Sequence, residues 1–117
     1  MDLHIAPERG GEPDEADLRS LLEWLQHERE RPWRAALVLG TAEPGEMGST
    51  FDTLHVVGAG GVALLGHALS AWFGTRRGHL RVRVRGADGS ELVLEAELKD
   101  PDAVVARLTQ IGVSGDA

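Results

Sequence analysis

The feature that most constrains the fold of this chain is a long uncharged segment in its middle. From Thr53 to Phe73 there is no Asp, Glu, Lys or Arg, although charged residues make up 26% of the 117 residues. Apolar side chains leave water when a protein folds, so other parts of the chain must cover this segment. We expect a helix that is broken near Gly58–Gly61 and continues from Val62 to about Phe73. That helix should close over a sheet and form the centre of the core.

Two alternating runs predict a β-hairpin. In residues 79–85 and 91–98, apolar residues alternate with residues that are mainly charged. A two-residue loop at Asp88-Gly89 would place an arginine and a leucine on one face, whereas a three-residue loop over 87–89 keeps the apolar residues together. We therefore expect the three-residue loop, with a polar face that largely neutralises itself. The expected cross-strand pairs are Val84–Leu92, Arg85–Glu91, Arg81–Glu95 and His79–Glu97.

Two further helices and two strands complete the expected elements. Asp14 and Asp100 are suitable N-caps, and Pro101 fits the first helical position after Asp100. The short apolar runs 3–6 and 35–39 have the length of strands. Each helix carries apolar residues at a helical spacing, which predicts a buried stripe. The stripes consist of Leu18, Leu21, Leu22 and Leu25 in the first helix and Val104, Val105, Leu108 and Ile111 in the last.

The expected element order is β-α-β-α-β-β-α. This order predicts an α+β fold with a four-stranded mixed sheet covered by helices, in which the first β-α-β unit holds parallel strands. The length is typical of one domain, and no linker divides the chain. We therefore expect residues 1–117 to form a single domain with an ordered core of about 2–112.

The composition excludes several classes of protein. The chain has no Cys, which rules out disulfide frameworks, zinc–cysteine sites, iron–sulfur clusters and thiol nucleophiles. The net charge of −7 disfavours general binding to nucleic acid, because phosphates require a positive surface. The sequence starts without a basic segment followed by an apolar one, so we expect no signal peptide and a cytoplasmic protein.

No group of residues forms a catalytic or metal-binding pattern in the sequence. None of the five histidines has the His-x-x-x-His spacing that places two ligands on one helix face. No serine lies in a Gly-x-Ser-x-Gly context, which is typical of a nucleophile elbow. We therefore predict no catalytic residue, no metal, no cofactor and no enzymatic activity.

Two alternative interpretations of the uncharged segment stay open. Gly58–Gly61 lies within a Gly-x-Gly-x-x-Ala pattern, so the domain could be a small ligand- or nucleotide-sensing module. The pattern is isolated, because only three apolar residues precede it and no acid follows at about 20 residues. Leu54–Phe73 also has the 20 residues needed to cross a bilayer, as in a small membrane-attached subunit. Four glycines, two histidines and a serine weaken that interpretation.

Charged and aromatic residues indicate candidate surfaces. The arginines near the hairpin are expected to form a solvated strand face, because the hairpin glutamates pair with them and no aromatic residues are interleaved for base stacking. Trp24 lies about 100° around its helix from the leucine stripe. Exposed tryptophans are enriched at interfaces, so Trp24 and Trp33 are candidates for partner binding. The basic cluster consists of Arg76, Arg77, Arg81, Arg83 and Arg85.

Three motifs along the chain carry a family resemblance. They are Leu-x-x-Trp-Leu at 21–25, Pro-Gly-x-Met-Gly at 44–48, and Ala-Trp-Phe at 71–73 before the Arg76-Arg77 pair. With the expected element order, they resemble the effector-associated constant component family of bacterial conflict systems over nearly the whole chain. The motifs are modest in specificity, and none of them is catalytic.

The resemblance implies a non-enzymatic accessory or adaptor protein of a bacterial anti-phage system. Such proteins couple, recruit or restrain an effector, often a caspase-like or trypsin-like peptidase, together with an NTP-dependent switch protein. This chain looks like the stand-alone version. We expect contact with a protein through the first helix, or through the loop at 44–47 with the start of the long helix. The candidate partner-binding residues are Trp24, Trp33, Pro44, Glu46 and Met47.

Overall fold

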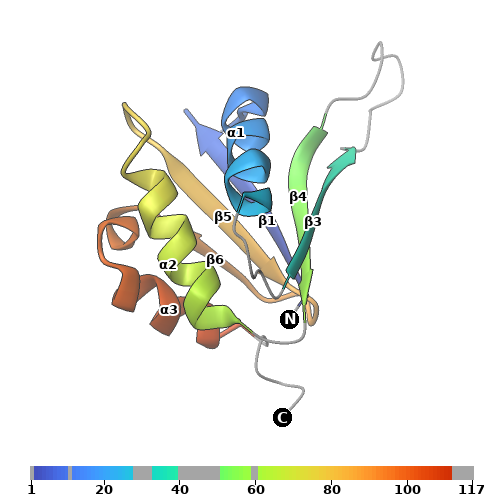
Figure 1. The fold of residues 1–117 in the computed structure, drawn as a ribbon, viewed down its shortest axis with the longest axis vertical. Helices are drawn as coiled ribbons and strands as arrows, with labels where there is room; N and C mark the ends of the chain where they lie inside the picture. The colour runs from blue at the N-terminus through green and yellow to red at the C-terminus, as the bar shows by residue number, and fades with distance from the viewer. Residues whose placement is uncertain (1, 11, 28–32, 40–50, 59–60, 112–117) are drawn as a thin grey trace.

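The computed structural model of the chain describes residues 2–10, 12–27, 33–39, 51–58 and 61–111. In this part of the chain, three α-helices lie on one side of a sheet (Figure 1). The elements in chain order are β1 (Asp2–Arg9), β2 (Glu12–Pro13), α1 (Glu15–Gln26), β3 (Trp33–Leu39), β4 (Phe51–Gly58), α2 (Val62–Phe73), β5 (Arg81–Gly86), β6 (Glu91–Leu94), the 3₁₀ helix η1 (Ala96–Lys99) and α3 (Pro101–Thr109).

The main strands pair in the order β3-β4-β1-β5-β6, and every pairing is antiparallel. The short strand β2 pairs with the end of β1. β4 lies between β1 and β3, and β1 lies between β4 and β5, so each β-α-β connection passes over one strand. This is the split β-α-β order of ferredoxin-like folds, to which β6, η1 and α3 are added.

The α+β class is confirmed, but the expected four-stranded mixed sheet is wrong in strand number and in strand direction. The main path contains five strands and no parallel pair among the described residues. β1 and β3 do run in the same direction, because each pairs antiparallel with β4. They are not neighbours, so the expected parallel pairing does not form. Of the five strands on the main path, the one that was not expected is β4.

The first half of the uncharged segment forms β4. The expected broken helix is therefore wrong in this half. β4 forms a hairpin with β3 and pairs with β1 on its other edge. Leu54 and Val56 are fully buried, while His55 and Val57 point to the opposite face. This period of two is that of a strand, and β-branched residues favour it. The missing charges therefore reflect a central strand followed by α2, which starts at Val62 as expected.

The β5–β6 hairpin has the expected register. Val84 pairs with Leu92, and Arg85 pairs with Glu91. Gly89 in the connecting loop has a φ of +89°, a left-handed conformation that glycine adopts without steric cost. Alternation of side chains along two strands was therefore sufficient to set the pairing.

One predicted pair of this hairpin is wrong because β6 is short. The chain leaves the sheet after β6 and enters η1, so Glu97 does not lie opposite His79. Glu97 accepts a hydrogen bond from Arg107 at 3.0 Å, and His79 Nε2 lies 2.6 Å from Oε1 of Glu95. The predicted proximity of Arg81 and Glu95 is confirmed, at 3.6 Å.

The N-caps of α1 and α3 are the aspartates expected from the sequence. The Asp14 side chain accepts a hydrogen bond from the backbone N–H of Asp17, and Asp100 accepts one from Asp102. These bonds satisfy N–H groups that have no acceptor within the helix. Pro101 occupies the first turn of α3, where a missing N–H does no harm.

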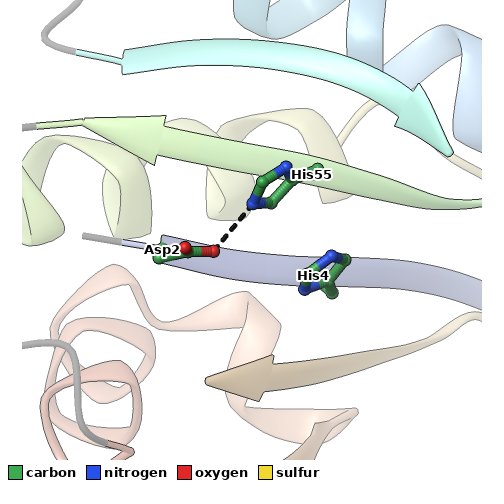
Figure 2. A group of neighbouring side chains, drawn as sticks. All are labelled: Asp2, His4 and His55. Atoms are coloured by element: carbon green, nitrogen blue, oxygen red, sulfur yellow. Dashed lines mark hydrogen bonds and ion pairs between the residues drawn. The ribbon is translucent and has the colours of Figure 1, made fainter. Parts of the chain in front are cut away.

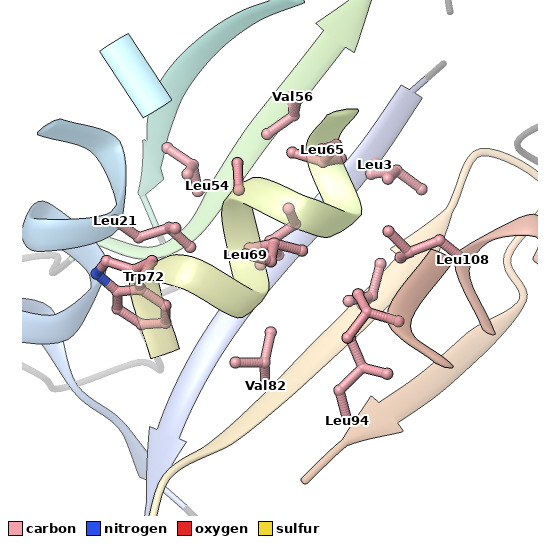
Figure 3. Close-up of a cluster of buried hydrophobic side chains, with 14 of the residues drawn as sticks. Leu3, Leu21, Leu54, Val56, Leu65, Leu69, Trp72, Val82, Leu94 and Leu108 are labelled. Atoms are coloured by element: carbon pink, nitrogen blue, oxygen red, sulfur yellow. The ribbon is translucent and has the colours of Figure 1, made fainter. Parts of the chain in front are cut away.

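α2 packs over the sheet beside α1 and α3 and carries the centre of the core (Figure 3). Leu65, Leu69 and Trp72 of this helix are fully buried. Gly66 lets α3 approach closely, since a Cβ at this position would lie 2.5 Å from Cγ2 of Val105. The sheet contributes Leu3, Ile5, Leu54, Val56, Val82, Val84 and Leu94 to the same cluster.

Candidate functional site

The two faces of the sheet differ in what covers them. One face packs against the helices, and the other carries no helix among the described residues (Figure 1). Because side chains alternate along a strand, each strand contributes to both faces. We call the second surface the open face. It consists of Arg34, Ala36 and Val38 of β3, Thr53, His55 and Val57 of β4, Asp2, His4 and Ala6 of β1, Arg81, Arg83 and Arg85 of β5, Glu91 and Val93 of β6, and Glu95 directly after β6.

Two arginines of the open face form ion pairs. Arg83 lies 3.5 Å from Glu8 and 3.7 Å from Glu91, and Arg81 lies 3.6 Å from Glu95. The contacts with Glu91 and Glu95 join exposed side chains and contribute about 0–1 kcal/mol each, whereas Glu8 is only 7% exposed. The arrangement agrees with the interpretation of the basic cluster as a paired strand face.

Asp2, His4 and His55 meet at one end of the open face (Figure 2). His4 on β1 lies directly opposite His55 on β4, and their rings stack with centroids 4.4 Å apart and an interplanar angle of 7°. Oδ1 of Asp2 lies 2.7 Å from Nε2 of His55. The ligand atoms of the three side chains all lie within 4.8 Å of one another. No sequence spacing reveals this group, because strand pairing brings its members together.

The environment of His4 favours a neutral imidazole. Burial lowers the pKa of His4, and the neighbouring His55 and Arg85 lower it further, against a smaller opposing effect of Asp2. A neutral imidazole has a free lone pair on one ring nitrogen. The group borders a hollow of about 460 Å³ that is also lined by Arg85 and Gly86. Small molecules and ions can therefore reach these side chains.

Trp24 lies beside a groove on α1. The groove has a volume of about 390 Å³ and is lined by Ser20, Glu23, Trp24 and His27. Trp24 is half-buried and packs against the edge of the core. Its Nε1 is buried without a hydrogen-bond acceptor among the described residues. The structure thus places this predicted contact residue at a concave part of the surface.

The other predicted contact residues do not share this position. Trp33 is 3% exposed, and its Nε1 donates a hydrogen bond to the carbonyl oxygen of Leu25 at 3.3 Å. Its ring therefore joins β3 to the end of α1 and is not offered to a partner in the folded domain. Pro44, Glu46 and Met47 lie outside the described residues.

A buried carboxylate holds the ends of three elements together. The side chain of Asp17 on α1 is 1% exposed and accepts hydrogen bonds from Arg9 of β1 and from Arg76, which follows α2. Burial by itself raises the pKa of Asp17, but the hydrogen bonds and charges of the two arginines outweigh it and leave the pKa lowered. Ser20 accepts further hydrogen bonds from Arg76 and from Nε1 of Trp72. Arg76, a member of the predicted basic cluster, thus neutralises Asp17.

The glycine-rich pattern at 58–63 lies where β4 ends and α2 begins. An eight-residue strand precedes it, in place of the three-residue lead-in expected from the sequence. Gly61 has a φ of +90° and caps α2 without a side-chain hydrogen bond. A dinucleotide-binding turn also requires an acid about 20 residues later, where this chain has Leu80. The strand fits the nucleotide-sensing alternative, but the acid that would contact the ribose is absent at that position.

The membrane alternative rested on Leu54–Phe73. Within the part of the chain that the structure describes, no helix has both the length and the apolar character needed to cross a bilayer. The segment is divided between β4 and α2. Trp72, near the end of this segment, is fully buried in the core.

Comparison with known proteins bears on the whole domain. The family model described as Effector Associated Constant Component 1 matches residues 10–112. This range includes the three α-helices and all of the sheet except β1. No curated protein and no solved structure matches the chain. The predicted resemblance is confirmed: the chain is an accessory component of effector-associated systems and belongs to the Effector Associated Constant Component 1 family.

Proposed function

We propose that this chain is a non-enzymatic adaptor that couples an effector to an NTP-dependent switch by direct protein–protein contact in the bacterial cytoplasm. The effector is a peptidase of caspase-like or trypsin-like type, and the system acts against phage. Membership of an effector-associated family supports the accessory role. The groove beside Trp24 supports contact with another protein.

The half-buried ring of Trp24 is the observation on which this proposal depends. A tryptophan at a groove offers a large apolar area with few rotatable bonds, and such residues commonly dominate binding energy at interfaces. Glu23 lines the same groove and adds negative charge beside the ring. A partner segment with an apolar side chain next to Lys or Arg would match both features.

Co-purification with the proteins encoded beside this gene tests the adaptor role. Each candidate peptidase and switch protein is co-expressed with the full chain, and complexes are measured by size-exclusion chromatography and titration calorimetry. We expect a stable complex with at least one of them. The Trp24→Ala variant should weaken it by about 2 kcal/mol or more, the usual threshold for a dominant interface residue.

Two further variants separate the groove from the fold. Glu23→Arg reverses the charge at the groove through an exposed side chain, so it should weaken binding without changing the melting temperature. Glu91→Arg makes the same charge change on the open face and should leave binding intact. The adaptor role fails if no neighbouring protein binds. The groove is the wrong surface if Glu91→Arg disrupts a complex that Trp24→Ala and Glu23→Arg leave unchanged.

A further inference from the structure

We propose that Asp2, His4 and His55 form a binding site for a divalent transition-metal ion, with Zn²⁺ as the expected ion. The three side chains come from the two neighbouring strands β1 and β4 and gather on the open face (Figure 2). They belong to the opposite layer from the groove on α1. Metal binding here is therefore independent of the adaptor role proposed above.

The pairing of the two strands supplies the geometry. Asp2 and His4 are two residues apart on β1, so they point to the same face, and His55 is the cross-strand partner of His4. All ligand atoms lie within 4.8 Å of one another. Around a tetrahedral ion with bonds of about 2.0–2.2 Å, ligand atoms lie about 3.3 Å apart. Side-chain rotation can close this difference while the paired backbones stay in place.

The contacts within the group show what must change when an ion binds. The rings of His4 and His55 are stacked, so their in-plane lone pairs run side by side and do not converge. Rotation about χ1 and χ2 turns both ring edges toward a common point above the sheet. The bond from His55 to Asp2 opens at the same time, and the carboxylate becomes the third ligand. Each group exchanges a weak contact for a metal bond.

The donor set selects the class of ion. Two imidazoles and one carboxylate suit Zn²⁺, Co²⁺, Ni²⁺ and Fe²⁺, whereas Mg²⁺ and Ca²⁺ prefer oxygen ligands alone. Three protein ligands leave a fourth position for water or for an anion. Arg85 lines the same hollow and is the cross-strand partner of His4 on β5. Its positive charge opposes a cation, so the site should bind the ion more weakly than the ligands alone would allow.

Titration calorimetry of the full chain with ZnCl₂, without an affinity tag, tests the site. We expect one ion per chain. His4→Ala and His55→Ala should each weaken binding by about 100-fold or more, and Asp2→Asn by about tenfold, since loss of even an outer partner of a metal ligand costs about 10–100-fold. Arg85→Ala should strengthen binding by about two- to fivefold, the usual strength of a partly exposed charge interaction.

His67→Ala is the matched control, because His67 is exposed on α2 and lies outside the group. It should bind zinc as the parent chain does. The imidazole ¹⁵N resonances of His4 and His55 should shift on zinc addition, while those of His67 should not. The site is wrong if the parent chain binds no stoichiometric zinc, or if binding survives both His4→Ala and His55→Ala. Melting temperatures measured without zinc identify any variant whose loss comes from unfolding.

Discussion

The two faces of the sheet are built from the same strands but differ in burial. Ile5 pairs with Val84 on the helix-covered face, and both are fully buried. One residue earlier on β1, His4 pairs with Arg85 on the open face. A shift of a single residue along β1 and β5 thus passes from packed core to a polar surface. Whether a side chain is buried therefore depends on which face of the sheet it points to.

This difference separates stability from interaction. Buried apolar side chains supply most of the folding free energy, whereas exposed charge pairs contribute little. Substitutions on the covered face should therefore change stability strongly. Substitutions on the open face should change what binds there while leaving the fold intact.

The largest expected effect comes from shortening a core side chain. Leu69→Ala removes a fully buried leucine from α2 and should lower the free energy of unfolding by about 2–5 kcal/mol. Leu64→Ala on the same helix is the matched control, because Leu64 is 43% exposed. It should change stability by less than about 0.5 kcal/mol. Urea unfolding of both variants makes the comparison, and equal losses would contradict the assignment of the faces of α2.

The next effect concerns the buried carboxylate. Asp17→Asn leaves two arginines without a charge partner and should cost about 2 kcal/mol at pH 7. This is below the cost of about 3–5 kcal/mol for a fully buried pair, because the Arg9 and Arg76 side chains keep 30% and 26% of their surface exposed. Thermal unfolding at pH 7 measures the loss, and a variant as stable as the parent would show that the cluster is not stabilising.

The pH dependence of the parent chain tests the same cluster. The pKa of Asp17 is lowered below its ordinary value of 3.8, so the folded state binds fewer protons there than the unfolded state. The stabilisation is complete above pH 3.8 and is lost as the pH falls through the lowered pKa. Asp17→Asn should lack this part of the acid dependence. An acid unfolding curve that keeps the same shape in the variant would contradict the assignment.

A smaller effect is expected where two helices approach. A Cβ at residue 66 would lie 2.5 Å from Val105, so Gly66→Ala overpacks the contact between α2 and α3. Overpacking costs about 1–3 kcal/mol, and the better helix propensity of alanine offsets about 1 kcal/mol. Gly74→Ala is the control, since its nearest neighbour atom would lie 3.4 Å away. Chemical unfolding should show a loss only at residue 66, and Val105→Ala should recover part of it.

The smallest effect is expected on the open face. Arg81→Ala removes a long ion pair between two exposed side chains, so it should change stability by at most about 0.5 kcal/mol. High salt should reduce even this difference, because exposed charges are screened. A loss as large as that of Leu69→Ala would mean that the open face is covered in solution.

Local patterns predicted much of this fold. Both aspartate caps, the start of α2 at Val62 and the register of the β5–β6 hairpin depend on residues close in sequence, and these predictions are confirmed. β4 was missed because most of it lies in the uncharged segment 53–73, whose lack of charge suggested one broken helix. The alternation of Leu54 and Val56 with polar or exposed neighbours was the available signal. The order of the strands could not be predicted, since it depends on which distant segments pair.

The candidate sites differ in the same way, because some depend on local sequence and others on the pairing of distant segments. Trp24 was found because its place on α1 follows from helical spacing alone. The group of Asp2, His4 and His55 was not found, because only the pairing of β1 with β4 joins its members. The burial of Asp17 between two arginines could not be predicted either, because it depends on contacts across the whole fold.

A disulfide trap tests the central claim that β4 lies beside β1 with His4 opposite His55. The chain has no Cys, so His4→Cys/His55→Cys introduces the only two thiols. Directly opposite residues on antiparallel strands have Cα atoms about 4.5–5.5 Å apart, within the range of about 4.4–6.8 Å that a disulfide requires. Mild oxidation should give an intramolecular disulfide in this variant and free thiols in His4→Cys/His67→Cys. Free thiols in the first variant, or equal disulfide formation in both, would contradict the account.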